Sequence, residues 1–338
     1  MGRISLLQPF FLVCLAALAF CCSLSGSSLP ATDTDPSPLL PGEHYATLGD
    51  VQLHYTVAGD GPLLIVFSPG WGPGSLYLQR GLAPLEQHYK VLFIDTRGSG
   101  KSSRPSNEAK MSGADMADDI EQLRMHLGLQ KIRLLGHSDS GAIAIDYAER
   151  YPAEVSDLIL VDSSKLGKSE ADKAEREQSS QLINSLKSDP RYKAAFAAWD
   201  RPWPPTTDES MMQFLKDTFP FYFADLDNVP TFAKTLEGTT PSSYALRTHN
   251  NADSTFPWRQ QERLGEVRAR TLVIVGKQDR ICPTLIAEHI HEGIPGSTLV
   301  EVDDSAHFPW IEQPVKFFDA VNQFLKASTV IQSQKPLP

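Results

Sequence analysis

Short apolar runs alternate with helical patterns along both ends of this chain of 338 residues, and the alternation stops between residues 162 and 264. Apolar runs bounded by polar residues are typical of strands buried on both faces of a sheet. Such runs lie at residues 91–94, 132–135 and 158–161, and alternating apolar residues predict strands at 51–57 and 63–67. Further strands are expected at 271–275 and 298–302, with helical patterns at 76–88, 115–127, 142–150, 284–291 and 315–325. This alternation predicts an α/β fold with a mostly parallel sheet and helices on both faces.

The central interruption has a different character. Residues 162–264 are rich in charge, proline and aromatic side chains and show mainly helical periodicity. We interpret them as a helical lid inserted between two parts of one core, residues 43–161 and 265–330, with a tail at 331–338. A chain of this length can bury a substantial apolar core without disulfide or metal support.

The N-terminus has the pattern of a targeting segment. Arg3 precedes an apolar stretch over residues 10–22, and mostly small residues follow to position 28. Residues 1–28 are therefore predicted to be a signal peptide or signal anchor, and residues 29–42 a linker rich in proline, serine and threonine. We expect a secreted protein or one in the lumen of the secretory pathway, with anchoring by an uncleaved segment as the alternative. Removal of the segment leaves Cys282 as the single cysteine.

A nucleophile turn is predicted where the apolar run 132–135 meets a helix. The run Gly136-His137-Ser138-Asp139-Ser140-Gly141 places small residues two before and two after Ser138, as the strained turn of a nucleophile elbow requires. Ser140, two residues later, satisfies the same spacing with Ser138 and Ala142 as its small neighbours, so it stays a rival nucleophile, although Ser138 directly follows the strand. Asp139 is excluded in that role because His137 is not small.

An acid and a base follow in the order that such hydrolases use, each after a later strand. Asp279 comes just after the apolar run 271–275, and His307 comes after the run 298–302. We predict that His307 takes the serine proton and that Asp279 orients the imidazole. Asp162, after an earlier strand, is the fallback acid.

The oxyanion of an acyl-transfer reaction needs two backbone N–H donors. One should come from Asp139, the residue after the nucleophile, and the other from the turn after the run 63–67, where Trp71 is the expected donor. Glycines in the run Ser68-Pro69-Gly70-Trp71-Gly72-Pro73-Gly74 permit close approach of the backbone to a substrate.

With these residues in place, the chain resembles the proline iminopeptidase-like branch of the α/β-hydrolase fold family. The run Asp95-Thr96-Arg97-Gly98-Ser99-Gly100-Lys101-Ser102 is similar to the Asp-x-Arg-Gly-x-Gly-x-Ser loop of that branch, and the elbow, acid and histidine lie where the family has them. The oxyanion turn departs from the His-Gly-Gly-Pro-Gly of many members, which puts the aminopeptidase activity in question.

The substrate pocket is harder to predict. Gly70, His137 and Trp310 adjoin the expected site, and the lid residues Trp199, Phe221 and Tyr222 are candidates for an apolar acyl pocket, as are Trp203, Phe214, Phe219, Phe223 and Trp258. An iminopeptidase binds a free amine through carboxylates, for which the lid offers Glu170, Glu175, Asp225 and Glu237. Each of these side chains is also explained by ordinary packing or a solvated surface.

The expected function is that of a serine hydrolase acting on an ester, lactone or amide of a small organic substrate through an acyl-enzyme intermediate. The alternatives are a proline iminopeptidase-type aminopeptidase, or a member that cleaves carbon–carbon bonds or cyclises a metabolite. A binding protein on an inactive hydrolase fold is disfavoured because no triad member is missing. No cofactor or metal is expected, since His289 and His291 lack partners at ligand spacing. A net charge of −10 disfavours nucleic acid, which leaves a small molecule or short peptide as the substrate.

Overall fold

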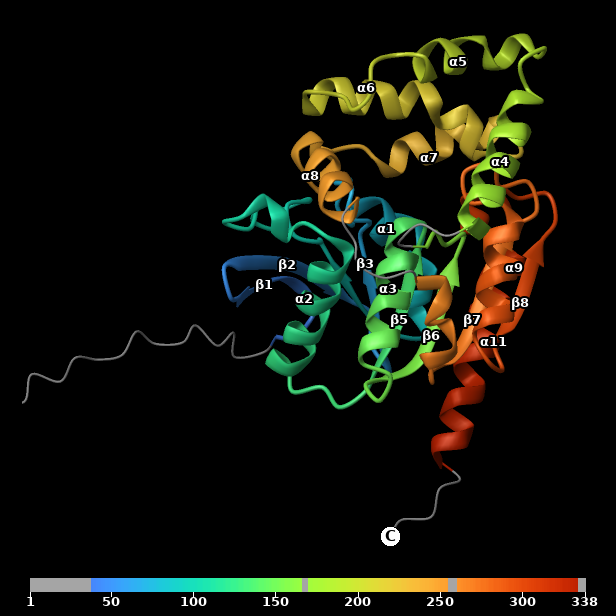
Figure 1. Cartoon of the computed structure of the whole chain (residues 1–338). Helices are drawn as coiled ribbons and strands as arrows, with labels where there is room; N and C mark the ends of the chain where they lie inside the picture. Colours follow the sequence, from blue (N-terminus) through green and yellow to red (C-terminus); the bar gives the residue numbers. More distant parts are fainter. Residues whose placement is uncertain (1–37, 166–169, 255–259, 334–338) are drawn as a thin grey trace, which may run out of the picture. The chain divides into compact units, whose positions relative to one another are not determined.

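The computed structural model describes residues 38–165, 170–254 and 260–333 (Figure 1). The predicted signal segment, most of the linker and Trp258 lie outside these residues. Within them, eight strands form one sheet in the order β1-β2-β4-β3-β5-β6-β7-β8. The first two pairs, β1 with β2 and β2 with β4, are antiparallel and the others are parallel. The strands are β1 (Gly42–Leu48), β2 (Val51–Ala58), β3 (Leu63–Phe67), β4 (Lys90–Ile94), β5 (Ile132–His137), β6 (Val155–Val161), β7 (Arg270–Gly276) and β8 (Thr298–Val302).

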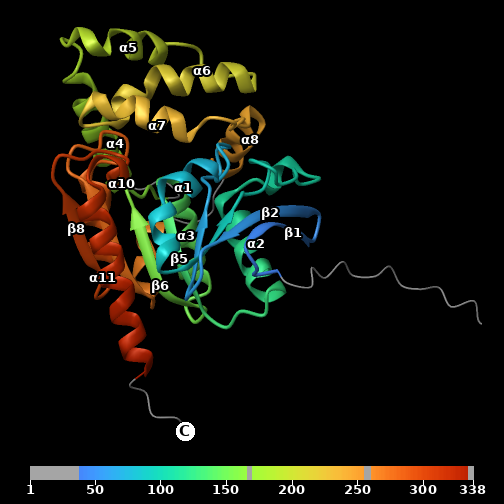
Figure 2. The same cartoon turned by 180° about the vertical axis from the view of Figure 1, so that it is seen from behind.

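Helices cover both faces of the sheet, as predicted. In β3, Ile65 and Phe67 pack into one apolar cluster and Leu64 and Val66 into another, because successive side chains of a strand point to opposite faces. Helices α2 (Gly113–His126), α3 (Asp139–Arg150) and α9 (Thr284–Gly293) cover the first face. Helices α1 (Leu76–Gly81) and α11 (Pro314–Ser333) cover the other, which Figure 2 shows from behind.

Two local features differ from the prediction. Strand β1 was not expected, because only its alternate residues His44, Ala46 and Leu48 are buried and the run is therefore not continuously apolar. The helix predicted over residues 76–88 ends at Gly81, and a short 3-10 helix, Ala83–Gln87, with Pro84 in its first turn continues the chain.

The connection between β6 and β7 forms the helical lid. It contains α4 (Glu170–Asn184), α5 (Lys193–Trp199), α6 (Asp208–Thr218), α7 (Val229–Thr235) and α8 (Ser243–Asp253). Its apolar residues, among them Leu215, Phe219 and Phe232, pack in one cluster with Phe308 of the core. Figure 1 shows α6, α7 and α8 above the end of the sheet to which the loops after the parallel strands lead. None of the described helices is long and apolar enough to cross a membrane.

Candidate active site

Ser138 occupies the sharp turn between β5 and α3. Its backbone has φ +58° and ψ −126°, a conformation that costs a non-glycine residue about 1–3 kcal/mol and persists only where the surroundings impose it. Its N–H donates to Val161 O at 3.0 Å, and its carbonyl accepts from the N–H groups of Gly141 and Ser164, each at 3.0 Å. The bonds to Val161 and Ser164 tie the turn to the end of β6, the bond from Gly141 closes the turn into α3, and together they hold the strained residue in place.

Glycine is required on both sides of this turn. A Cβ on Gly136 would lie 2.5 Å from Ser140 O, and one on Gly141 would lie 2.2 Å from Ser163 Oγ. The backbone of the turn therefore packs too closely for any side chain at these two positions.

Ser140, the rival in the sequence, is located elsewhere. It is fully buried in the first turn of α3, and its Oγ accepts from His137 N–H and donates to His137 O, both at 2.9 Å. The hydroxyl closes the turn internally and is not among the groups that line the pocket.

His307 and Asp279 meet in the loops after β8 and β7. His307 Nδ1 lies 2.8 Å from Asp279 Oδ2, and the second carboxylate oxygen accepts from the N–H groups of Ile281 at 2.8 Å and Cys282 at 3.1 Å. Because a carboxylate faces Nδ1, that nitrogen carries the proton, and Nε2 keeps its lone pair. The pair can therefore accept a proton at Nε2 and stabilise the resulting imidazolium.

Asp162, the fallback acid, lies next to this pair but differs from Asp279 in its hydrogen bonds. It is fully buried, and its Oδ1 accepts from Gly276 N–H at 2.8 Å. Burial, followed by the charge of Asp279, raises the pKa of Asp162 well above its usual value. The raised pKa favours the neutral acid form of Asp162, which makes no contact with a ring nitrogen of His307 among the described hydrogen bonds.

The oxyanion turn is fastened to the elbow through a side chain. Gly70 N–H donates to Asp139 Oδ2 at 2.7 Å, so the residue after Ser138 holds the loop that carries Trp71. Trp71 lines the same pocket as Ser138. Gly70, predicted to line the pocket, is not among its lining residues; it is buried where a Cβ would meet Met116 and His249 within 3 Å.

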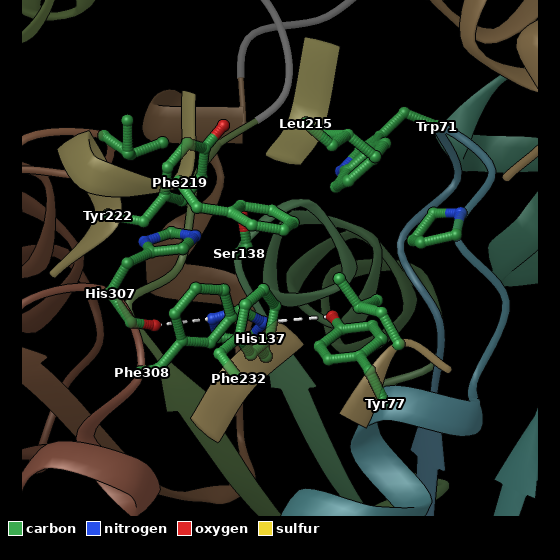
Figure 3. A pocket seen from close by; sticks show the side chains of 13 residues that line it. Trp71, Tyr77, His137, Ser138, Leu215, Phe219, Tyr222, Phe232, His307 and Phe308 are labelled. Carbon is green, nitrogen blue, oxygen red and sulfur yellow. Dashed lines mark hydrogen bonds between the residues drawn. The ribbon is translucent and has the colours of Figure 1, made fainter. Parts of the chain in front are cut away.

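Ser138 and His307 open into one cavity of about 120 Å³ (Figure 3). Its wall is mostly apolar and combines core and lid residues. The lining residues are Trp71, Pro73, Tyr77, His137, Ser138, Leu215, Phe219, Tyr222, Phe232, Leu236, Ile281, His307 and Phe308. No carboxylate, lysine or arginine is among these described residues.

His137 forms the floor of this cavity as a neutral ring. Its Nε2 lies 2.9 Å from His307 O and its Nδ1 lies 3.2 Å from Tyr77 Oη, the two contacts dashed in Figure 3. Burial, together with the neighbouring His307, holds the pKa of His137 well below its usual value. With Nε2–H donating to the carbonyl and Tyr77 donating to Nδ1, every polar atom of the ring is satisfied.

Of the aromatic residues predicted for the pocket, His137, Phe219 and Tyr222 line it. The other described candidates are not among its lining residues: Trp199, Trp203, Phe214, Phe221, Phe223 and Trp310. Phe221 is fully buried in a separate lid cluster with Tyr192. Trp199 is 42% exposed and packs on Phe221 at 5.5 Å between ring centroids. Trp310 packs edge-on against His137 at 4.7 Å, behind the cavity wall.

The lid carboxylates that an iminopeptidase would need are engaged elsewhere or exposed. Glu175 Oε1 lies 2.6 Å from both Lys165 Nζ and His289 Nδ1. Asp225 caps a short 3-10 helix through its side chain, and Glu237 is exposed. The side chain of Glu170 lies outside the described residues.

One group of potential metal ligands coincides with the site. Asp279, Cys282 and His307 present ligand-type atoms within 4.8 Å of one another. Both oxygens of Asp279 and Nδ1 of His307 already form hydrogen bonds, and burial, then the charge of Asp279, raises the pKa of the Cys282 thiol well above its usual value. The arrangement as it stands fits an acid–histidine pair better than a metal, which needs an ionised thiol.

Comparison with known proteins identifies the fold family. The family model described as "alpha/beta hydrolase fold" matches residues 64–314. A proline iminopeptidase of Saccharolobus solfataricus is 28% identical over 282 residues, which are 80% of this chain and 87% of that protein. A 2-hydroxy-6-oxononadienedioate/2-hydroxy-6-oxononatrienedioate hydrolase of Klebsiella pneumoniae is 27% identical over 285 residues, which are 81% of this chain and 91% of that protein. The structure is also similar to the solved structure of an α/β-fold hydrolase from Bacillus anthracis, with a TM-score of 0.66 and 20% sequence identity. This similarity covers 83% of this chain and 98% of the Bacillus anthracis chain.

Proposed function

The chain belongs to the α/β-hydrolase fold family, and from this premise we propose that it is a serine hydrolase that cleaves esters or lactones with small apolar acyl groups. The observation that carries the proposal is one cavity shared by the strained Ser138 and by His307, whose Nδ1 is bonded to Asp279.

In the proposed reaction Ser138 Oγ attacks the substrate carbonyl carbon while its proton passes to His307 Nε2. The negative charge on the carbonyl oxygen is stabilised by the N–H groups of Asp139 and Trp71, and the positive charge of the His307 imidazolium is stabilised by the Asp279 carboxylate. His307 then donates the proton to the leaving alkoxide as the carbon–oxygen bond breaks, which leaves an acyl group on Ser138. A water molecule then attacks the acyl carbon while its proton passes to His307 Nε2. His307 returns this proton to Ser138 Oγ as the bond between the acyl carbon and Oγ breaks, which releases the acid and restores the free serine.

The character of the wall supports the choice of substrate. An amine bound in this cavity would be an ammonium without a carboxylate partner, and burying an unpaired charge costs several kcal/mol. The side chains of Leu215, Phe219 and Phe232 instead offer apolar contact, from which each buried methylene gains about 0.8 kcal/mol. Apolar acyl groups are therefore favoured over amino-terminal proline, although a proline iminopeptidase is among the relatives.

The test combines labelling with a direct comparison of substrates. A fluorophosphonate should modify wild-type protein at Ser138 and leave Ser138→Ala unmodified, and peptide mapping locates the adduct. The same preparation should hydrolyse p-nitrophenyl butyrate faster than proline naphthylamide. A preference for the proline substrate would instead favour an aminopeptidase, and labelling at Ser140 would refute the assignment of the nucleophile.

A further inference from the structure

A buried histidine of the lid reaches the turn behind Ser138. His249, on α8, is 2% exposed, and its Nε2 lies 3.3 Å from Asp139 Oδ1 and 3.3 Å from Asp253 Oδ2. Its Nδ1 lies 2.9 Å from Met111 O, at the start of the segment leading into α2. The ring therefore joins the lid to two elements of the core.

Both nitrogens of this ring face only acceptors. A neutral imidazole carries one N–H and would direct a lone pair at either the Met111 carbonyl or the carboxylates, so the geometry favours the doubly protonated form of His249. Burial alone would lower the pKa of His249, but Asp139 and Asp253 raise it to about 9. These two acids are the titratable groups that face the ring among the described residues, and Asp146 of α3 acts on Asp253.

Asp139 transmits this contact to the oxyanion turn. One of its carboxylate oxygens faces His249 Nε2 and the other accepts from Gly70 N–H at 2.7 Å. Burial opposes the ionisation of Asp139, yet His249 and the Gly70 N–H together hold the pKa of Asp139 below its usual value. Trp71, the next residue after Gly70, and the backbone of Asp139 supply the two N–H donors in the proposed reaction.

We propose that His249 is a positioning residue for the oxyanion hole: its imidazolium orients the Asp139 carboxylate, which in turn fixes the Gly70–Trp71 turn. The inference rests on the proposed function, because the two donors matter only if an oxyanion forms. If the proposal holds, the position of α8 affects catalysis directly, because the His249 ring belongs to the lid whereas the two N–H donors belong to the core. The effect persists while His249 is charged and is lost as the pH rises through about 9.

The test uses His249→Gln, which retains a hydrogen-bond donor and cannot carry charge, with His126→Gln at an exposed position of α2 as the matched control. With p-nitrophenyl butyrate, His249→Gln should lower kcat roughly 10- to 100-fold with little change in KM, because misplacement of a catalytic group by about 1 Å costs up to about 100-fold. The fall of wild-type kcat near pH 9 should be absent from His249→Gln and present in His126→Gln. Asp253→Asn removes one of the two anions and should move that fall to lower pH, while its amide oxygen can still accept from Gly113 N–H.

Three outcomes would count against the inference. If wild-type protein is not labelled at Ser138, the proposed function fails and the inference fails with it. If Ser138 is labelled but His249→Gln keeps the wild-type kcat and the fall near pH 9, only the inference is refuted. If the loss in His249→Gln follows a lowered melting temperature with an unchanged pH profile, His249 is a stabilising residue alone, and the positioning role is refuted.

Discussion

The length of the acyl group should control the rate, because the cavity is apolar and small. An apolar cavity of about 150 Å³ holds a benzene molecule, so the cavity of about 120 Å³ beside Ser138 should accept an acyl chain of roughly four to six carbons. Each methylene buried contributes about 0.8 kcal/mol, or roughly a fourfold gain in kcat/KM. Between acetyl and hexanoyl esters, four added methylenes should contribute about 3 kcal/mol in total, which is roughly a 200-fold gain in kcat/KM. Chains longer than the cavity should give no further gain in kcat/KM.

Leu215 is the residue with which to test this reasoning. It lies on α6, is 7% exposed and contributes to the cavity wall. Leu215→Ala shortens an isobutyl group to a methyl group and enlarges the cavity. The acyl chain length that gives the highest kcat/KM should therefore increase by about two or three methylenes. Met212→Ala, on the same helix but outside the lining residues, should leave the optimum unchanged.

The assay is hydrolysis of p-nitrophenyl esters from acetate to dodecanoate by the three proteins, with melting temperatures measured in parallel. Leu215→Ala should also lower the unfolding free energy by about 2 kcal/mol, the lower end of the range for buried leucines, because the cavity already adjoins the side chain. A flat dependence on chain length in wild-type protein, or the same shift in Leu215→Ala and Met212→Ala, would refute the assignment of this cavity to the acyl group.

Four further substitutions test the roles of buried hydroxyl and carboxyl groups. Ser140→Ala should keep turnover but lower the unfolding free energy by about 1–3 kcal/mol in urea titrations, because the buried His137 N–H loses its acceptor; loss of fluorophosphonate labelling would contradict this. Asp279→Asn should lower kcat by a factor on the order of 10⁴, whereas Asp162→Asn, which replaces a neutral acid, should cost far less in the same ester assay; a larger loss in Asp162→Asn would transfer the role of the acid to it. Glu149 is 2% exposed, and burial raises its pKa to about 9, so the stability associated with its bound proton is fully present below about pH 4 and lost as the pH rises toward 9. Glu149→Gln should therefore raise the unfolding free energy by up to about 3 kcal/mol at pH 7 and reduce the loss between pH 5 and 8; equal slopes for the two proteins would refute that ionisation state.

The framework of the fold and the order of the site residues could be predicted because both depend on local signals. Strands buried on both faces are continuous apolar runs, and Ser138 and Asp279 each follow such a run. His307 follows the shorter edge strand β8 at the same end of the sheet. Strand β1 was not predicted because this edge strand has one exposed face, so its apolar residues alternate with polar ones and give a weaker hydrophobic pattern. The signal-peptide prediction stays a prediction, since residues 1–28 lie outside the described part of the chain.

The wall of the pocket could not be predicted because it depends on how the lid helices pack. Phe221 and Tyr222 are neighbours in sequence, yet Phe221 packs into the lid and Tyr222 lines the cavity. His249 was missed for the same reason: a single histidine in a helical segment carries no signal until tertiary packing brings it to Asp139. A local pattern identifies residues that act next to their own strand, and it does not identify those that act across elements.

Three aspartates lie around the elbow, and their charge states also depend on contacts between elements that the sequence does not reveal. Asp279 accepts from three donors, whereas Asp162 has one backbone donor, and burial and the neighbouring Asp279 raise the pKa of Asp162 well above its usual value. Despite its burial, Asp139 has its pKa held below the usual value by His249 and Gly70 N–H. Since two carboxylates in contact cannot both ionise at low cost, a neutral Asp162 can lie beside Asp279 without opposing the charge that orients His307 in the proposed reaction. In that reaction Asp279 acts on the side of the base and Asp139 on the side of the oxyanion.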